Sequence, residues 1–127
     1  MKYEEYAPIV LRISIALVIL WFGLVGVFNY ESLVGYLPEF AYSLPISPNN
    51  LVILNGVLEI ILGTLLIVGF FTRIVAFILF LHILVIAIGL GYNDVAIRDY
   101  GLAFATLAIF LNGPDKWCLD MKLRNKF

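Results

Sequence analysis

A long apolar run over residues 51–73, LVILNGVLEIILGTLLIVGFFTR, carries one carboxylate near its middle, Glu59. An apolar run of this length is typical of a helix that spans a membrane. An ionisable side chain at the centre of such a helix costs roughly 2.5–3.5 kcal/mol on insertion scales, so it needs a partner or a function. The run therefore predicts a membrane helix in which Glu59 meets polar groups from elsewhere in the chain.

The composition extends this prediction to the whole chain. Of its 127 residues, 63% are hydrophobic and only 13% are charged, whereas soluble domains are about half apolar and a quarter charged. The length suffices for about four spans of ~20 residues with short loops, and it leaves no room for a separate soluble domain. We therefore expect a multi-pass protein whose main partner is the lipid bilayer. The net charge of -1 argues against nucleic acid as a partner.

Cysteine and histidine are too scarce for most redox centres. The chain has one cysteine, Cys118, and one histidine, His82. A disulfide, a CxxC pair, a bis-histidine haem site and a three-histidine metal site cannot be built from one residue of each type. We expect no metal site and no electron-carrying cofactor of the chain's own. Cys118, expected near the surface, indicates no function.

Hydropathy and turn signals predict an all-α membrane protein, an antiparallel bundle of four transmembrane helices over residues 8–29, 51–71, 74–92 and 96–112. Asn50 is the expected N-cap of the second helix, and Asn112, Gly113 and Pro114 end the fourth. Residues 114–127 form a basic tail with Trp117 as an interface anchor.

The connection over residues 30–50 does not fit one continuous helix. Pro38, Pro45 and Pro48 interrupt it, and its aromatic residues favour an interfacial position. We interpret it as an outer loop with a short amphipathic piece on the membrane surface. An ordinary connecting loop and a lid over the bundle are the alternatives.

Basic residues predict the orientation. With both termini on one side, seven of the eight basic residues fall on that side: Lys2, Arg12, Arg73, Lys116, Lys122, Arg124 and Lys126. The positive-inside rule then places both termini in the cytoplasm and the protein in the cytoplasmic (cell) membrane. Arg12 lies about one turn inside the first helix, so we expect its side chain to reach back to the lipid headgroups.

Polar side chains recur at one depth of the expected bundle. One residue from each helix lies eight or nine residues from the outer end of that helix, about 12–14 Å deep: Trp21, Glu59, His82 and Thr106. A second set lies nearer the outer surface: Asn55, Arg98 and Asp99. Gly56 and Gly63 on the face of Glu59 mark it as a packed face. We therefore predict a polar pocket in the outer half of the bundle.

Each of these residues also has a structural interpretation. Glu59 could fix helix register through a hydrogen bond to His82, and Arg98 and Asp99 could form a local ion pair at a helix start. On the functional interpretation, Glu59 and His82 are catalytic residues that relay protons. Trp21, Asn55, Arg98, Asp99 and Thr106 would then bind the ligand.

Three segments in order resemble the DoxX/DoxD family of small four-helix membrane proteins: LRISIALVILWFG, GVLEIILGTLLIVGFFTRIVAFILFLH and RDYGLAFATLAIFLNGPDKWCLD. The resemblance covers nearly the whole chain, residues 1–127, as a single domain. It implies a four-helix bundle in the cytoplasmic membrane. By analogy with some relatives, the resemblance implies a subunit of a quinone-linked oxidoreductase, such as thiosulfate:quinone oxidoreductase. By analogy with others, it implies a role in redox-stress complexes or in membrane-protein assembly.

The leading hypothesis is a membrane subunit of a quinone-linked redox complex, in which the polar pocket holds a quinone or a similar small ligand. Since no electron-carrying motif is present, whether the chain is an enzyme stays open, and electrons would come from a redox partner protein or from a reductant in the pocket. The second hypothesis is a non-catalytic assembly or scaffold protein. A third, a small transporter, is disfavoured because four short helices leave little room for a pathway, unless the chain forms a homo-oligomer.

Overall fold

The computed structural model describes residues 3–37 and 39–126, and this part of the chain contains helices and turns but no strand. Four long helices are present, α1 (Ala7–Phe28), α2 (Pro48–Val68), α3 (Thr72–Leu90) and α4 (Asp94–Asn112), followed by a short helix, α5 (Leu119–Lys126). The helices over Tyr3–Phe28, Pro48–Val68 and Thr72–Leu90 are long and apolar enough to cross a membrane. Lys2 and Pro38, which entered the sequence analysis, lie outside the described residues.

Three helix starts differ from the sequence prediction by two or three residues, and α3 begins at Thr72 rather than at residue 74. Helix α2 begins at Pro48, and its N-cap is Ser47, whose hydroxyl accepts a hydrogen bond from the amide of Asn50. Asn50 is therefore inside the helix. Proline suits the first helical position because an amide hydrogen there would have no partner within the helix. Helix α4 begins at Asp94, where the side chain of Asn93 accepts a hydrogen bond from the amide of Ala96 at 2.9 Å. The prediction that this helix starts at Ala96 was wrong by two residues.

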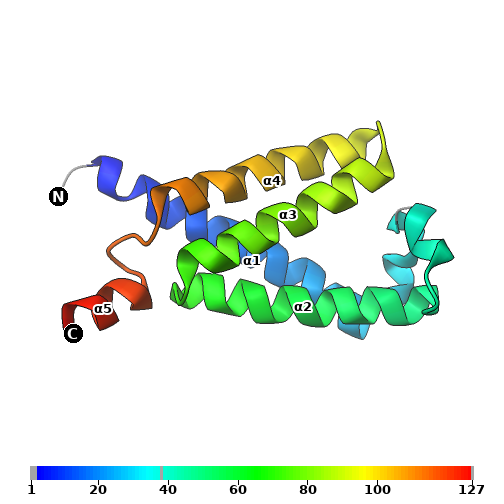
Figure 1. Ribbon diagram of the computed structural model, residues 1–127, viewed down its shortest axis with the longest axis horizontal. Coiled ribbons are helices and arrows are strands. Elements are labelled where there is room, and N and C mark those ends of the chain that lie inside the picture. The colour runs from blue at the N-terminus through cyan, green and yellow to red at the C-terminus, as the bar shows by residue number, and fades with distance from the viewer. Residues whose placement is uncertain (1–2, 38, 127) are drawn as a thin grey trace.

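The helices pack as two pairs. Helix α1 packs most closely on α2, and α3 packs on α4, whereas α2 and α3 share few contacts. Figure 1 shows α2 and α3 together at their connecting turn and diverging toward the opposite end. We call the end with both chain termini and this turn the terminal end, and the opposite end the loop end.

Glycine allows the close crossing of α1 and α2. A Cβ atom added to Gly56 would lie 2.8 Å from the carbonyl oxygen of Gly23, and one added to Gly23 would lie 2.9 Å from that of Gly56. Both distances are too short for carbon, so the two backbones touch only because neither residue has a side chain. This confirms the expectation that Gly56 lies on a packed helix face.

The buried apolar core lies mainly toward the terminal end. It consists of Ile15, Ala16, Ile19, Leu62, Leu66, Val75, Ala76, Leu79, Ile83, Ala103 and Ile109. Residues from all four long helices contribute, so the core ties the two helix pairs together at this end. The loop end has no comparable apolar filling among the described residues, and the cavity described below occupies that end.

Arg12 corrects a sequence prediction. Its side chain is 2% exposed, and it does not reach toward headgroups. Its Nε donates to Oδ2 of Asp115 at 2.7 Å, and its Nη1 donates to the carbonyl oxygens of Leu66 and Ile67 at 2.8 and 2.6 Å. The last turn of α2 leaves carbonyl groups without helical partners, and a guanidinium satisfies them together with the carboxylate. Arg12 therefore fastens α1 to α2 and to the chain that follows α4.

The tail is also fastened to the turn between α2 and α3. Both carboxylate oxygens of Asp120 accept hydrogen bonds from backbone amides, those of Phe71 and Thr72, each at 2.8 Å, at the start of α3. Cys118, expected near the surface, is fully buried against Gly69 and Thr72. The tail thus closes the terminal end of the molecule, and it forms α5 where the sequence analysis expected no helix.

The connection between α1 and α2 forms a cap at the loop end. It contains three short 3-10 turns, Tyr30–Ser32, Val34–Tyr36 and Glu39–Ser43. The hydroxyl of Tyr42 donates to the carbonyl oxygen of Val34, which holds two of these turns together. Figure 1 shows the cap between the diverging ends of α2 and α3. We refer to residues 30–37 and 39–47 as the cap.

Candidate functional site

The divergence of α2 and α3 leaves a cavity of about 870 Å³ at the loop end. All four long helices and the cap contribute to its wall. Most of the lining side chains are aliphatic or aromatic, and the polar ones are Asn55, Glu59, His82, Arg98 and Asp99. A mostly apolar cavity with a few convergent polar groups is the usual form of a small-molecule site.

Glu59 on α2 and His82 on α3 face each other at the wall of this cavity. Oε1 of Glu59 lies 3.6 Å from Nε2 of His82, and it accepts a hydrogen bond of 2.9 Å from the side-chain amide of Asn55, one turn earlier on α2. Glu59 is 8% exposed, so the protein covers most of its carboxylate. The pair is close enough for a strong electrostatic interaction when the imidazole is protonated, but 3.6 Å is too long for a direct hydrogen bond.

Nε2 of His82 is buried and has no hydrogen-bond partner among residues 3–37 and 39–126. Buried polar atoms of folded proteins are nearly always hydrogen-bonded, so a group like this one calls for an explanation. A ligand atom in the cavity that bonds to Nε2 would supply one. This nitrogen is the most specific indication of ligand binding in the cavity.

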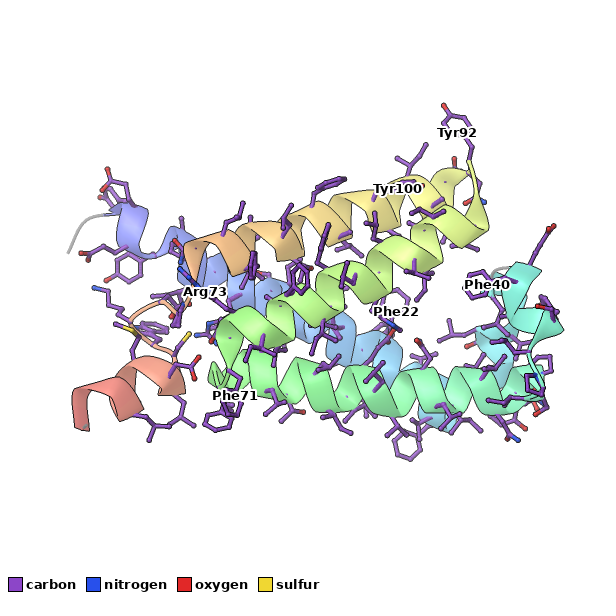
Figure 2. The ribbon with its side chains drawn as sticks, in the orientation of Figure 1. Phe22, Phe40, Phe71, Arg73, Tyr92 and Tyr100 are labelled. Atoms are coloured by element: carbon purple, nitrogen blue, oxygen red, sulfur yellow. The ribbon has the colours of Figure 1, made fainter. Side chains whose placement is uncertain are left out.

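Arg98 and Asp99 lie in the second turn of α4, between Glu59 and the loop end. Nη2 of Arg98 lies 3.5 Å from Oδ1 of Asp99, and the Arg98 guanidinium carbon lies 5.3 Å from the ring centre of Phe22 on α1. Asp99 is near enough to Glu59 for their charges to interact. Figure 2 shows Phe22 between the ribbons of α2 and α3. The arginine therefore bridges α4 and α1 across the cavity by a cation–π contact.

Two residues of the predicted site lie outside the cavity. Trp21 is 66% exposed and points away from the bundle, so its expected place beside the ligand was wrong. One helical position turns a side chain by about 100°, and Phe22 takes the place expected for Trp21. Thr106 is fully buried, and its hydroxyl donates to the carbonyl oxygen of Leu102 on its own helix at 2.8 Å. It therefore does not line the cavity.

The cap supplies site residues that sequence reasoning did not identify. Leu33, Leu37, Phe40, Ala41 and Leu44 line the cavity from its loop end. Figure 2 shows Phe40 on the cap. This position agrees with the alternative interpretation of the connection as a lid. The available signal was the recurrence of apolar residues at intervals of three or four in this proline-rich stretch.

The side-chain types that bind metals lie mostly apart from one another in the described part of the chain. Within the described parts of the chain, no three His, Cys, Asp or Glu side chains gather in a group that could hold a metal ion. The cavity instead combines hydrogen-bonding groups with a large apolar wall. Such a site suits an organic amphipathic molecule better than an ion.

Apolar helices long enough to span a bilayer, packed around an amphipathic cavity, define a small helical membrane protein with an internal cavity. The family model for DoxX matches residues 7–91. The chain therefore belongs to the DoxX family, as the resemblance of its motifs indicated. Neither the curated proteins nor the solved structures yielded a significant match.

Proposed function

We propose that this DoxX protein is the membrane subunit of a quinone-linked redox complex and that its cavity binds the quinone headgroup. The observation that carries the proposal is the unpartnered Nε2 of His82 beside the carboxylate of Glu59 at a cavity wall. A quinone presents carbonyl oxygens that accept hydrogen bonds, and its reduction consumes protons. His82 and Glu59 can serve both needs.

The proposal includes an orientation in the membrane. All four long helices cross the cell membrane, both termini lie in the cytoplasm, and the cavity lies in the outer half of the bilayer. The supporting observations are the excess of basic residues at the terminal end and the position of Arg98 at the loop end. Helix α4 carries no charged residue between Asp99 and Asn112, which suits a fourth span whose charged start lies near the surface.

Some polar side chains of the cavity bind the ligand, and others transfer protons to it. The imidazole of His82 donates a hydrogen bond, and then a proton, to one carbonyl oxygen of the ligand. Glu59, held in place by Asn55, returns a proton to the imidazole. Arg98, whose side chain is about half exposed, donates a hydrogen bond to the second carbonyl oxygen. The second proton of the quinol is taken up at that oxygen from water at the loop end, by way of Asp99. Phe22 offers an aromatic surface to the ring.

Electrons must enter from outside this chain. The sequence has no set of residues for haem, an iron–sulfur cluster or a flavin. A redox partner protein, or a reductant that reaches the cavity, would supply two electrons for each quinone reduced to quinol. On this proposal the chain contributes the quinone site and the proton-transfer residues, and the complex contributes the electron donor.

The test is binding of a decyl-chain benzoquinone to the purified protein in lipid nanodiscs, followed by turnover with its redox partner. Loss of a hydrogen bond to a charged group costs about 1.5–3 kcal/mol, so Glu59→Gln and His82→Ala should each weaken binding by about tenfold or more. Thr64→Val is the matched control, because Thr64 is exposed on α2 and bonds only to the carbonyl of Ile60 on its own helix.

The same variants separate this proposal from a scaffold function. A scaffold whose polar residues only fix helix packing predicts that both site variants lose thermal stability and that no quinone effect is seen. If the wild-type protein does not bind the quinone, or if Glu59→Gln and His82→Ala bind it as tightly as wild type, the quinone proposal is wrong.

A further inference from the structure

The cavity has an opening between α2 and α3. Five side chains along these helices both line the cavity and face outward: Leu54, Leu58, Ile78, Leu81 and Val85. Their exposed fractions run from 39% for Leu58 to 56% for Leu54. Side chains can have both properties only where the cavity reaches the surface of the molecule. We call the gap between these residues the α2–α3 slot.

The slot is wholly apolar along the helices that form it. Its five side chains are aliphatic, and none carries a charge or a hydrogen-bonding group. The polar groups of the cavity instead lie on the same two helices one position further around, at Asn55, Glu59 and His82, and on α4 at Arg98 and Asp99. The cavity therefore has a polar wall and an apolar opening.

The α1–α2 and α3–α4 faces of the cavity and its terminal end are covered. Helices α1 and α2 touch at Gly23 and Gly56, and α3 packs along α4, so neither pair leaves an opening. The buried core and the tail close the terminal end. The cap covers the loop end only in part, because Phe40 and Leu44 line the cavity and are 48% and 43% exposed. At the depth of these apolar helices, an opening between two spans faces lipid chains rather than water.

From these observations we infer that the ligand of this site carries an apolar chain and enters from the bilayer through the α2–α3 slot. The inference rests on the proposed function for the headgroup and adds the chemical class of the ligand and its route. The headgroup bonds to the polar wall, while the chain lies along Leu58 and Leu81 and extends into the lipid. Moving this chain from lipid into the slot costs little, because the slot residues are as apolar as lipid tails.

The first experiment measures the rate of binding from the membrane. The probe is a decyl-chain benzoquinone dissolved in the nanodisc lipid. The double variant Leu58→Phe/Leu81→Phe fills the slot, and Leu17→Phe/Leu24→Phe is the matched control, because Leu17 and Leu24 are exposed on α1 outside the cavity. We expect the slot variant to slow association by about tenfold or more and the control to leave the rate within about twofold of wild type.

A cap variant tests the alternative route from water. Leu37→Phe/Leu44→Phe enlarges two cap residues that line the cavity. The inference predicts little change in the association rate of the decyl-chain quinone. If the cap variant slows binding and the slot variant does not, the ligand enters through the cap and the inference is overturned.

The second experiment detects the slot without any quinone. The reporter is Phe22→Trp, in a protein whose native tryptophans are replaced by Trp21→Phe and Trp117→Phe. Phe22 lines the cavity, so lipids brominated on their acyl chains should quench the reporter through the slot, whereas aqueous iodide should not. The slot variant should lower the quenching by brominated lipid at least about twofold, as expected when a filled opening excludes contact.

The two experiments give distinguishable failures. Quenching by brominated lipid without quinone binding would disprove the quinone proposal and leave the lateral opening in place. Quinone binding at an unchanged rate in the slot variant would disprove the lateral route and leave the quinone site in place. Absence of lipid quenching, together with cross-linking between copies across the slot, would show that a second copy of the chain covers it, which also overturns the inference.

Discussion

Oε1 of Glu59 and Nε2 of His82 lie 3.6 Å apart, on two helices that otherwise share few contacts. The pair therefore spans the two halves of the bundle at the point where they begin to separate. Asn55 holds the carboxylate from the loop-end side by a hydrogen bond of 2.9 Å, which leaves the imidazole nitrogen as the group free to meet a ligand. The most direct predictions follow from this arrangement.

Replacing Asn55 should weaken the site without unfolding the protein. Asn55→Leu removes the donor to Glu59 and leaves a largely buried carboxylate without that bond, at a cost of about 1–3 kcal/mol. We expect quinone affinity to fall about tenfold, which titration calorimetry measures. Unchanged affinity would show that Asn55 does not position Glu59 for binding.

Substitutions of Phe22 and Trp21 should have different effects on ligand affinity although the two residues are neighbours in sequence. Phe22 lines the cavity, so Phe22→Leu should weaken binding of an aromatic ligand about two- to tenfold, corresponding to roughly 0.5–1.5 kcal/mol for an aromatic contact. Trp21 faces outward, so Trp21→Leu should bind with the affinity of wild type. The opposite order of effects would contradict the placement of α1 around the cavity.

The buried ion pair at the terminal end should be a main support of the fold. Arg12→Leu or Asp115→Leu alone leaves an uncompensated buried charge, and we expect each to lower the free energy of unfolding by about 3–5 kcal/mol. The double variant should recover part of this loss. Lys116→Ala, which breaks the exposed pair with Glu5, should cost less than about 1 kcal/mol and is the control. Unfolding in mixed detergent micelles measures all four proteins.

Substitution of glycine by alanine should have opposite effects on stability at Gly56 and at Gly101. Gly56→Ala places a Cβ 2.8 Å from the carbonyl of Gly23, so α1 and α2 must separate and thermal stability should fall. Gly101→Ala meets no atom within 4 Å on α4 and replaces a poor helix former, so stability should stay the same or rise by up to about 1 kcal/mol. Equal effects of the two substitutions would show that α1 and α2 do not cross at Gly56.

Cys118 should behave as an inert thiol until the protein unfolds. Burial raises the pKa of the Cys118 thiol, an effect that the hydrogen bond from Thr72 partly offsets. Because the folded state holds this proton more tightly than the unfolded state, its contribution to stability is present below the ordinary cysteine pKa and is lost as pH rises toward the folded value. Maleimide labelling at neutral pH should be slow in the folded protein and fast in denaturant. Rapid labelling of the folded protein would show that the tail is not docked.

The sequence alone determined the membrane class, the long helices to within a few residues, and the family. These properties depend on local signals: long apolar runs, proline and glycine at helix ends, and short ordered motifs. Counting residues along the helices also brought Glu59, His82, Asn55, Arg98 and Asp99 to one region, because a helix advances by a fixed rise per residue. The cavity contains all five.

Only the tertiary structure decided which way each side chain points and what it meets. A rise per residue gives approximate depth but not rotation about the helix axis, so Trp21 and Thr106 were both expected in the pocket. Trp21 faces outward, and Thr106 is buried outside the cavity, nearer to the end of α4 at Asn112 than to its start at Asp94. Arg12 was expected at the headgroups because its partner, Asp115, lies 103 positions away in the sequence. The slot between α2 and α3 depends on how two helix pairs diverge, and this is a property of packing between distant segments that no local pattern contains.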